Sequence, residues 1–225
     1  MKTSNIWAVI PAYNEENEIS SIVKKTKKYV KNVVVVDDGS DDQTKQLAQN
    51  SGAKVLKHLV NLGKGAALKT GCDYVANKGA KFIIALDADA QHNPNDLPRF
   101  IEKLKKYDVI FSYRKLSREM PLILRIGNWF ISNTVKFLYG IKLKDTQCGF
   151  RAFSIETYRK IRWNAPDYSM ESEMISRAGK QRLKYVQIPI DTIYSDKYKG
   201  TTVLDGIKIV LNMFWWKFFN NKNKE

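Results

Sequence analysis

The stretch Phe82-Ile83-Ile84-Ala85-Leu86-Asp87-Ala88-Asp89 decides the fold of this chain. An unbroken apolar run of this length predicts a β-strand buried on both faces, because a half-exposed strand would alternate apolar and polar residues. The carboxylates that follow mark the point where the strand leaves the sheet. The same arrangement, an apolar run closed by acidic residues, occurs from Val33 to Asp38.

Three other short segments predict strands, at Ile6 to Ile10, Lys54 to Leu56 and Val109 to Ser112. Between the segments of the first half, apolar residues recur at helical intervals over residues 19–30 and 66–74. Strands that alternate with helices predict an α/β fold, with a Rossmann-like, mostly parallel sheet flanked by helices. In such sheets ligands bind beyond the carboxyl ends of the strands, where the acidic residues lie in this sequence.

The second half of the chain is less regular. Helices are predicted at Leu122 to Leu138, Glu171 to Lys180 and Asp205 to Phe219. Residues 145–151 predict a polar turn, and Tyr185 to Ile188 a strand that Pro189 ends. Because no linker rich in Pro, Gly or Ser divides the halves, we expect one domain over residues 1–225. Residues 97–225 would then add a helical elaboration with a terminal amphipathic helix.

The net charge indicates an anionic partner. The 225 residues include 38 Lys and Arg against 23 Asp and Glu, a formal charge of +15. By region, the charge is +2 in residues 1–96, +10 in residues 97–163 and +3 in residues 164–225. The excess is therefore concentrated in the middle of the chain, where an anion is expected to bind.

The cysteines, the start of the chain and the lack of long uncharged stretches indicate the cellular compartment of the protein. Cys72 and Cys148 are far apart and in no CxxC pair, which argues against a disulfide framework and a zinc cluster and favours a reducing cytosol. No signal-peptide pattern is visible at the start. No stretch free of charged residues exceeds ten, whereas a spanning helix needs about 20 apolar residues. We expect a cytoplasmic protein that does not cross a bilayer.

Asp87-Ala88-Asp89, with Gln91, is the most informative cluster. Two carboxylates at a strand end repel each other unless a cation lies between them, and Mg²⁺ or Mn²⁺ binds such oxygens together with phosphate. A metal-bound nucleotide diphosphate is one interpretation. The other is that both acids cap the helix expected near Pro94.

Residues 37–42 form a second acidic segment, Asp37-Asp38-Gly39-Ser40-Asp41-Asp42. Asp41 or Asp42 is placed to cap the following helix. Asp37 and Asp38 come too early for that role. A carboxylate at their position can accept a hydrogen bond from a base or a ribose hydroxyl.

Gly63-Lys64-Gly65 precedes a helix and resembles a phosphate-binding loop, but it matches neither GxGxxG nor GK[ST]. Two roles of this segment stay open: Lys64 contacts a phosphate, or the glycines allow close packing at the start of the helix.

The two histidines, His58 and His92, stand without a Ser or Cys in a nucleophile setting, so His-based nucleophilic catalysis lacks support. His92 is expected beside the metal site.

Taken together, these motifs resemble the inverting GT-A glycosyltransferases of the dolichyl-phosphate mannosyl and glucosyl transferase type. The matching segments, in the family's order over residues 6–205, are Pro11-Ala12-Tyr13-Asn14-Glu15, Val36-Asp37-Asp38-Gly39-Ser40, Asn61-Leu62-Gly63-Lys64-Gly65, Asp87-Ala88-Asp89-Ala90-Gln91-His92 and Asp145-Thr146-Gln147-Cys148-Gly149-Phe150-Arg151. The resemblance implies a GT-A fold and a metal-dependent, inverting transfer of a hexose from a nucleotide-sugar to a polyprenyl or dolichyl phosphate. GDP-mannose, UDP-glucose and UDP-N-acetylglucosamine are all open as the donor.

The resemblance also implies residue roles. The nucleotide-sugar half, residues 1–96, would bind the donor through Pro11, Tyr13, Asn14, Glu15, Asp38, Asp87 and Ala88, with Lys64 as a further candidate. Asp89 and Gln91 would bind Mg²⁺ or Mn²⁺. Arg114 and Arg125, with a basic residue near Lys197, would hold the acceptor phosphate, so that Asp89, Arg114 and Arg125 are the catalytic candidates. The chain departs from the family pattern at Lys197, usually Arg, at Asn128, usually Ser, and at Asn95, usually Glu.

A phosphate acceptor fits the residues present, because a phosphate monoester is mostly dianionic at pH 7 and needs no catalytic base. If the acceptor were instead a sugar or other hydroxyl, a base would be required, and Asp145 is the candidate. A basic nucleic-acid-binding module is the alternative from another class. The chain lacks the interleaved aromatic and basic patterns of such modules, so we expect no nucleic acid partner.

A lipid acceptor requires contact with a membrane. The segments Leu122 to Leu138 and Asp205 to Phe219 mix aromatic, apolar and basic residues, as interfacial helices do. Either these faces pack on the protein's own core, or they lie on the cytoplasmic face of the membrane as a peripheral contact. Trp215 and Trp216, close to the end of the chain, favour at least partial membrane contact.

Overall fold

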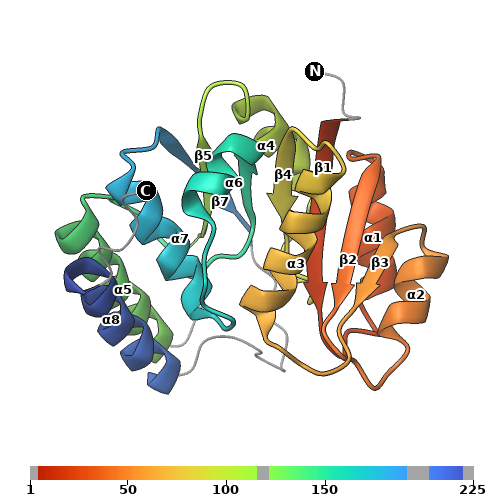
Figure 1. The fold of residues 1–225 in the computed structure, drawn as a ribbon, viewed down its shortest axis with the longest axis horizontal. Coiled ribbons are helices and arrows are strands. Elements are labelled where there is room, and N and C mark those ends of the chain that lie inside the picture. Colours follow the sequence, from red (N-terminus) through yellow and green to blue (C-terminus); the bar gives the residue numbers. More distant parts are fainter. Residues whose placement is uncertain (1–4, 116–121, 192–202, 220–225) are drawn as a thin grey trace.

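The computed structural model describes residues 5–115, 122–191 and 203–219 (Figure 1). Seven strands form a single sheet in the order β3-β2-β1-β4-β6-β5-β7. The strands are β1 (Ile6–Ala12), β2 (Asn32–Asp37), β3 (Lys54–Lys57), β4 (Phe82–Ala85), β5 (Val109–Arg114), β6 (Arg151–Ser154) and β7 (Tyr185–Ile190). The predicted α/β fold is confirmed, because every pair in the sheet is parallel except the two that β6 makes with β4 and β5.

Two details of the sheet differ from the sequence prediction. β6 begins at Arg151, the last residue of the predicted polar turn, and inserts antiparallel between β4 and β5. Its four residues carry no long apolar run, which is why the pattern did not predict it. Pro189 does not end β7, because β7 is an edge strand, where the missing N–H of a proline is tolerated.

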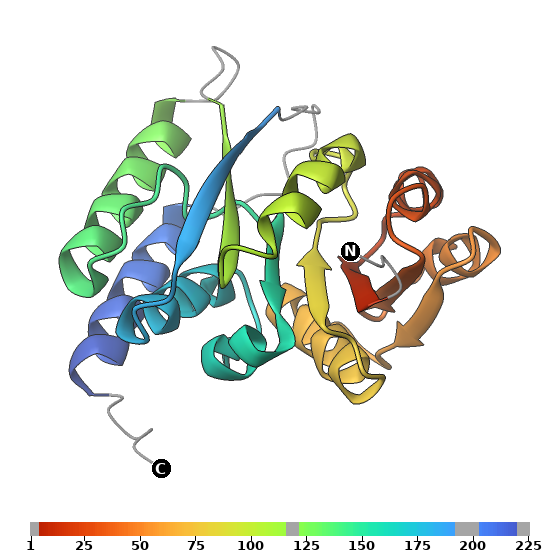
Figure 2. The ribbon, with the colours of Figure 1, turned by 90° about the horizontal axis from the view of Figure 1, so that it is seen from above.

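Helices cover both faces of the sheet (Figures 1 and 2). One face carries α1 (Ile19–Lys27), α2 (Thr44–Asn50) and α4 (Leu97–Lys103), with the short 3₁₀ turn Pro94–Asp96 before α4. The other carries α3 (Lys64–Asn77), α5 (Leu122–Tyr139), α6 (Ile155–Ile161), α7 (Ser169–Lys180) and α8 (Val203–Phe218). Strand residues alternate between the two cores: in β1, Val9 packs on the α3 side and Ala8 and Ile10 on the α1 side.

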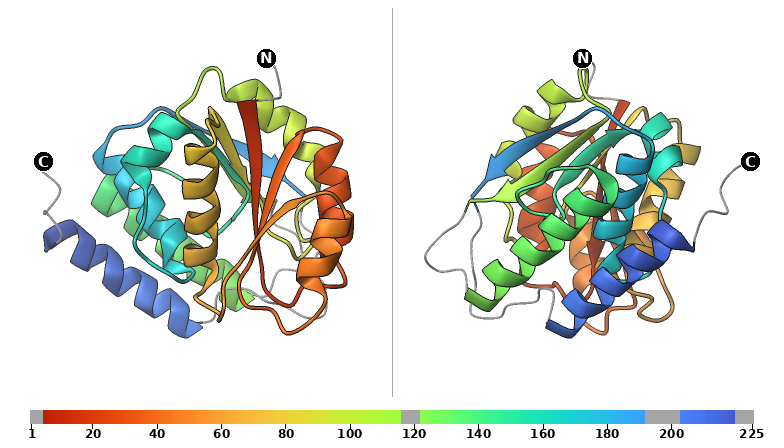
Figure 3. Two further views of the ribbon diagram at one scale, coloured as in Figure 1. Left: turned by 45° about the vertical axis from the view of Figure 1, so that its right-hand side comes forward. Right: turned by 90° about the vertical axis from the view of Figure 1, so that its left-hand side faces the viewer.

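α5 and α8 lie side by side at the end of the molecule farthest from β3 (Figures 2 and 3). Their inner faces are buried, through Ile131 and Val135 of α5 and Ile209 and Met213 of α8. Tyr139 donates a hydrogen bond from its hydroxyl to the Met213 carbonyl at 2.6 Å. Own-core packing, one of the two predicted roles of these helices, is therefore confirmed for one face of each. None of the described helices is long and apolar enough to span a membrane.

Candidate active site

The carboxyl ends of β1, β2 and β4 meet at one edge of the sheet, the lower edge in Figure 1. Ala12 pairs with Asp37 at the ends of β1 and β2, and Val9 pairs with Ala85 where β4 ends. Loops from these ends surround a cavity of about 320 Å³, here called the donor cavity. Of the predicted site residues it is lined by Pro11, Tyr13, Glu15, Asp38, Lys64, Asp87, Ala88, Asp89, Gln91 and Arg114.

Other lining residues were not predicted to have a role in the site. They are Ala12, Asn61, Gly63, Ala67, Gln147, Cys148, Asp167 and Tyr168. His92, expected beside the metal site, also lines the cavity. Gln147 and Cys148 belong to the polar segment of residues 145–151. Asp167 and Tyr168 precede α7 and carry no sequence signal that points to this edge of the sheet.

Asn14 joins two loops and is not among the lining residues of the donor cavity. Its backbone has φ 53°, a left-handed conformation that asparagine tolerates. Its Oδ1 accepts a hydrogen bond from the Asp41 amide at 3.1 Å, and its own amide donates to Ser40 Oγ at 2.9 Å. The structure therefore places Asn14 as a link between the β1 and β2 loops.

Asp38 fixes the loop that follows β3. Its carboxylate accepts hydrogen bonds from the amides of Leu62, at 3.0 Å, and Gly63, at 2.8 Å. His58 Nδ1 lies 2.6 Å from the same carboxylate. Asp38 thus lines the cavity, while its oxygens also hold the backbone of this loop in place. Its contact with the donor stays a prediction.

The glycines of Gly63-Lys64-Gly65 are required for close packing, one of the two alternatives left open by the sequence. A Cβ at Gly63 would lie 2.5 Å from the Pro166 carbonyl oxygen, and one at Gly65 would lie 2.4 Å from the Ala165 carbonyl oxygen. The start of α3 is therefore pressed against the segment that precedes α7. No larger side chain fits at either position without moving that backbone.

Lys64 bridges two carboxylates. Its Nζ lies 2.8 Å from Asp87 Oδ1 and 3.0 Å from Glu171 Oε1. Burial opposes the charged amine, but the two carboxylates raise its pKa above the usual lysine value. Glu171, on α7, is almost fully buried. Its neighbours fit an ordinary helix, so nothing in the sequence marks it as part of the site.

The Asp87 carboxylate is held on three sides. Although burial favours its neutral form, Lys64 and His92 keep its pKa below the usual range. A Cβ at Gly149 would lie 2.4 Å from Asp87 Oδ2, so the backbone of the 145–151 segment passes directly against it. His92 Nδ1 lies 3.6 Å from the same oxygen, and burial lowers the pKa of His92.

Asp89 and Gln91 fit a divalent cation. Burial and the negative charge of Asp87 raise the pKa of Asp89, the effect that a bound cation would offset. Among the described residues no three His, Cys, Asp or Glu side chains form a metal cage. Mg²⁺ and Mn²⁺ suit a site with one or two protein oxygens completed by substrate phosphate. The capping alternative fails, because Asn93 Oδ1 accepts from the Asn95 amide at the turn before α4.

Cys148 is a buried thiol that lines the donor cavity. It is 2% exposed, and burial raises its pKa to about 12. Its Sγ lies 2.8 Å from Ser112 Oγ and 3.5 Å from His92 Nε2. At neutral pH the thiol stays protonated and does not act as a nucleophile.

Arg114 and Asp145 form an ion pair at the wall of the donor cavity. Arg114 Nε donates to Asp145 Oδ2 at 2.6 Å, and Nη2 donates to Oδ1 at 3.1 Å. Although burial favours the neutral acid, this pair keeps the pKa of Asp145 below its usual value. A carboxylate with a lowered pKa is a weaker base, which counts against the predicted role of Asp145 as a general base.

A second cavity, of about 850 Å³, shares Arg114 with the donor cavity and is here called the basic groove. Its cationic lining residues are Arg114, Lys115, Arg125, Lys136, Lys142 and Lys144. Its apolar wall includes Ile126 and Trp129 of α5 and Leu143. Arg125 is thus placed in the groove and not in the donor cavity, and Arg114 lines both. Lys197 lies outside the described residues.

Part of the positive charge excess of residues 97–163 lines the basic groove. Each of its six cationic residues comes from that region, and its one acidic lining residue, Asp145, is paired with Arg114. Asn128 stands at its edge, donating from Nδ2 to the Lys144 carbonyl at 3.1 Å. Cations over an apolar wall suit an amphipathic anion.

Comparison with known proteins agrees with this geometry. The family model of glycosyl transferase family 2 matches residues 7–178. UDP-N-acetylglucosamine–dolichyl-phosphate N-acetylglucosaminyltransferase of Methanococcus voltae is 34% identical over 94% of this chain and 96% of its own. Undecaprenyl-phosphate mannosyltransferase of Micrococcus luteus is 27% identical over 89% of this chain and 88% of its own.

Among solved structures, glucosyl-3-phosphoglycerate synthase of Mycobacterium tuberculosis, in complex with Mg²⁺ and UDP, superposes with a TM-score of 0.74. The match covers 92% of this chain and 78% of that one, at 21% identity, and shows the fold. The chain belongs to glycosyl transferase family 2 and is a glycosyltransferase with the GT-A fold that uses a nucleotide-sugar donor.

Proposed function

We propose that the protein transfers a hexose or N-acetylhexosamine from a UDP-sugar to a polyprenyl or dolichyl phosphate at the membrane surface. The observation that carries the proposal is that Arg114 lines both the donor cavity and the basic groove. A sugar donor and an anionic lipid acceptor would meet at this residue. UDP is favoured over GDP by the name of the Methanococcus voltae relative.

On the donor side, Tyr13 is 42% exposed at the mouth of the cavity and is available to stack on a base. Asp89 and Gln91 would hold Mg²⁺ or Mn²⁺ together with the diphosphate. When bound there, the metal neutralises the charge that develops on the departing diphosphate. Lys64 keeps Asp87 ionised and fixed in position beside the cavity.

On the acceptor side, the phosphate oxygen is itself the nucleophile and attacks the anomeric carbon with inversion. The bond from that carbon to the diphosphate oxygen breaks, and UDP leaves with the bonding electron pair. Asp145 accepts hydrogen bonds from Arg114 Nε and Nη2, which holds the guanidinium in one orientation where Arg114 lines both cavities. Arg125 would receive the phosphate in the groove. Positioning two anions against their repulsion is the main task of these residues.

The α5–α8 surface supports the membrane part of the proposal. It consists of the exposed apolar residues Ile126, Trp129, Phe130, Phe137, Ile207, Leu211, Phe214, Trp215, Phe218 and Phe219. An exposed apolar area of this extent is unusual in a protein that stays in water. Ile126 and Trp129 belong both to this surface and to the basic groove, so a lipid would pass from one to the other without leaving apolar contacts.

The test is transfer of radiolabelled sugar, with UDP- and GDP-sugars compared in the presence of Mn²⁺. The proposal expects label in the organic phase only when polyprenyl phosphate is added. Transfer of the label to soluble saccharides alone would contradict the proposed function. A thermal-shift screen of UDP and GDP with Mn²⁺ identifies the nucleotide independently of the acceptor.

A further inference from the structure

The loop between β3 and α3 exposes three aliphatic side chains, Leu59, Val60 and Leu62, here called the apolar tip. Leu59 is 98% exposed, Val60 61% and Leu62 50%. Among residues 5–115, 125–191 and 206–219, exposed large apolar side chains lie only here, on the α5–α8 surface and at Tyr13 in the donor cavity. Within these ranges, exposed apolar side chains are thus confined to a few places, and the apolar tip is one of them.

The backbone of this loop is fixed, so the protein cannot bury the tip by folding it inward. The amides of Leu62 and Gly63 are bound to the Asp38 carboxylate. His58 donates its backbone N–H to the Asp37 carbonyl at 2.9 Å, and its Nε2 lies 3.0 Å from Thr70 Oγ1. A Cβ at Gly39 would lie 2.6 Å from the Val60 carbonyl carbon, so the loop is also pressed onto the β2 loop.

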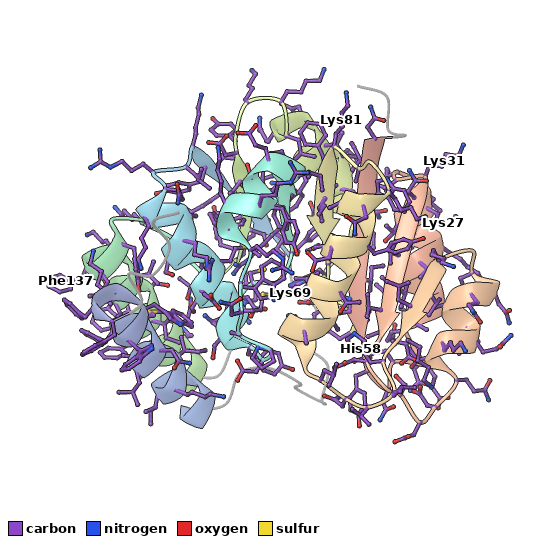
Figure 4. The ribbon with its side chains drawn as sticks, in the orientation of Figure 1. Lys27, Lys31, His58, Lys69, Lys81 and Phe137 are labelled. Carbon is purple, nitrogen blue, oxygen red and sulfur yellow. The ribbon has the colours of Figure 1, made fainter. Side chains whose placement is uncertain are left out.

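The tip stands at the mouth of the donor cavity. Asn61 and Gly63 line that cavity, while their neighbours Leu59, Val60 and Leu62 face the exterior. In Figure 1 this loop and the first turns of α5 and α8 lie at the same lower end of the molecule. In Figure 4, His58, where the loop begins, lies at that end, and Lys31 and Lys81 at the opposite one.

We propose that the apolar tip is a second membrane contact, separate from the α5–α8 surface, which enters the bilayer interface beside the donor cavity. The inference rests on the proposed function: a lipid-linked phosphate must reach the donor cavity from a bilayer, so the mouth of the cavity faces the lipid. Two contacts on either side of the mouth fix its orientation, whereas one would leave it free to tilt. The bilayer supplies the apolar partner that the fixed loop lacks.

The experiment uses single cysteines. Cys72 and Cys148 are buried, so an environment-sensitive thiol fluorophore labels an introduced exposed cysteine selectively. Leu59→Cys tests the tip, Leu211→Cys tests the α5–α8 surface, and Lys31→Cys at the opposite end is the control. Each labelled full-length protein is mixed with vesicles of phosphatidylglycerol and phosphatidylethanolamine that contain polyprenyl phosphate.

Blue-shifted emission at positions 59 and 211, but not at 31, is the expected result. A shift at 211 alone overturns the second contact and leaves the proposed function standing. No shift at either position, together with absence of glycolipid product, means that the proposed function has failed. A concentration-dependent shift at 59 without vesicles identifies a second copy of the chain as the occupant and also overturns the proposal.

A double variant separates a membrane role of the apolar tip from a role in the donor cavity. Leu59→Ser with Val60→Ser is expected to lower transfer to bilayer-embedded polyprenyl phosphate about tenfold, since two aliphatic side chains no longer enter the interface. Transfer to detergent-solubilised acceptor should be unchanged. An equal loss in both systems would mean that the loop serves the donor cavity and not the membrane.

Discussion

Arg114 and Asp145 are joined by two side-chain hydrogen bonds, at 2.6 Å and 3.1 Å, on the wall between the donor cavity and the basic groove. The pair is 31 residues apart in sequence and connects the end of β5 to the segment that leads into β6. Asp145 also accepts from the Gln147 amide at 3.0 Å. The guanidinium is thus held in one orientation before any substrate arrives.

Arg114→Lys keeps the charge but cannot form the two-bond pair. We expect kcat/KM for polyprenyl phosphate to fall about 100-fold, or about 2.7 kcal/mol, while the affinity for UDP with Mn²⁺ changes little. Steady-state kinetics with varied acceptor measures the first, and titration calorimetry the second. Arg159→Lys, on the exposed side of α6, is the matched control and should retain full activity. Unaltered acceptor kinetics in Arg114→Lys would remove Arg114 from the mechanism.

The ion pair also predicts how stability depends on pH. The pKa of Asp145 is lower in the folded than in the unfolded protein, so its stabilisation is fully present above the unfolded value of about 3.9 and is lost as the pH falls through the folded value. Asp145→Asn should cost about 3 kcal/mol at pH 7, because Arg114 loses its partner. The difference in Tm between the two proteins should shrink as the pH is lowered from 6 to about 3. A difference independent of pH would contradict the assignment.

We expect non-additive stability changes from substitutions in the cluster of Lys64, Asp87 and Glu171. Lys64→Met leaves two buried carboxylates without their cation and should cost about 3 to 5 kcal/mol. Adding Glu171→Gln removes one of the two charges and should restore part of that loss. Urea unfolding of the single variants and the double variant gives the coupling energy. If the two costs simply add, Lys64 and Glu171 do not act as a pair.

We expect a side chain at position 149 to weaken binding of the nucleotide in the donor cavity. Gly149→Ala places a methyl group against the Asp87 carboxylate and should raise the Kd for UDP with Mn²⁺ by about tenfold or more, at a cost of about 1 to 3 kcal/mol in stability. Gly127→Ala on α5 meets nothing within 4 Å and should stabilise the helix by about 0.5 to 1 kcal/mol. Equal UDP affinity in both variants would show that Asp87 has room to move.

The sequence predicted those parts of the fold that depend on local pattern. β1, β2, β4 and β5 follow from apolar runs such as Phe82 to Leu86, because burial on both faces demands continuous apolar residues. β3 is a partly exposed edge strand and was predicted from the short segment Lys54 to Leu56 alone. The acidic strand ends were correctly placed at one edge, since parallel strands bring their carboxyl ends together. The helices at 122–138, 171–180 and 205–219 were predicted to within a few residues of their bounds.

Features that depend on contacts between distant segments could not be predicted. β6 contains Arg151, which is 1% exposed and donates to the carbonyls of Thr146, Cys148 and Glu171. A charged residue satisfied by backbone oxygens has no signature in the sequence. The same holds for Glu171, whose partner Lys64 lies on another helix, and for Asp145, which the motif marked as important without revealing its ion pair with Arg114.

The central claim is transfer to a lipid phosphate, and the most direct measurement compares three acceptors in one assay: polyprenyl phosphate, the polyprenol of the same chain length, and a soluble sugar. Wild-type protein with Mn²⁺ and a radiolabelled UDP-sugar should form glycolipid with polyprenyl phosphate only, and Asp89→Asn should form none. Label on polyprenol or on the soluble sugar at an equal rate would contradict the account, because the phosphate would then not be the nucleophile.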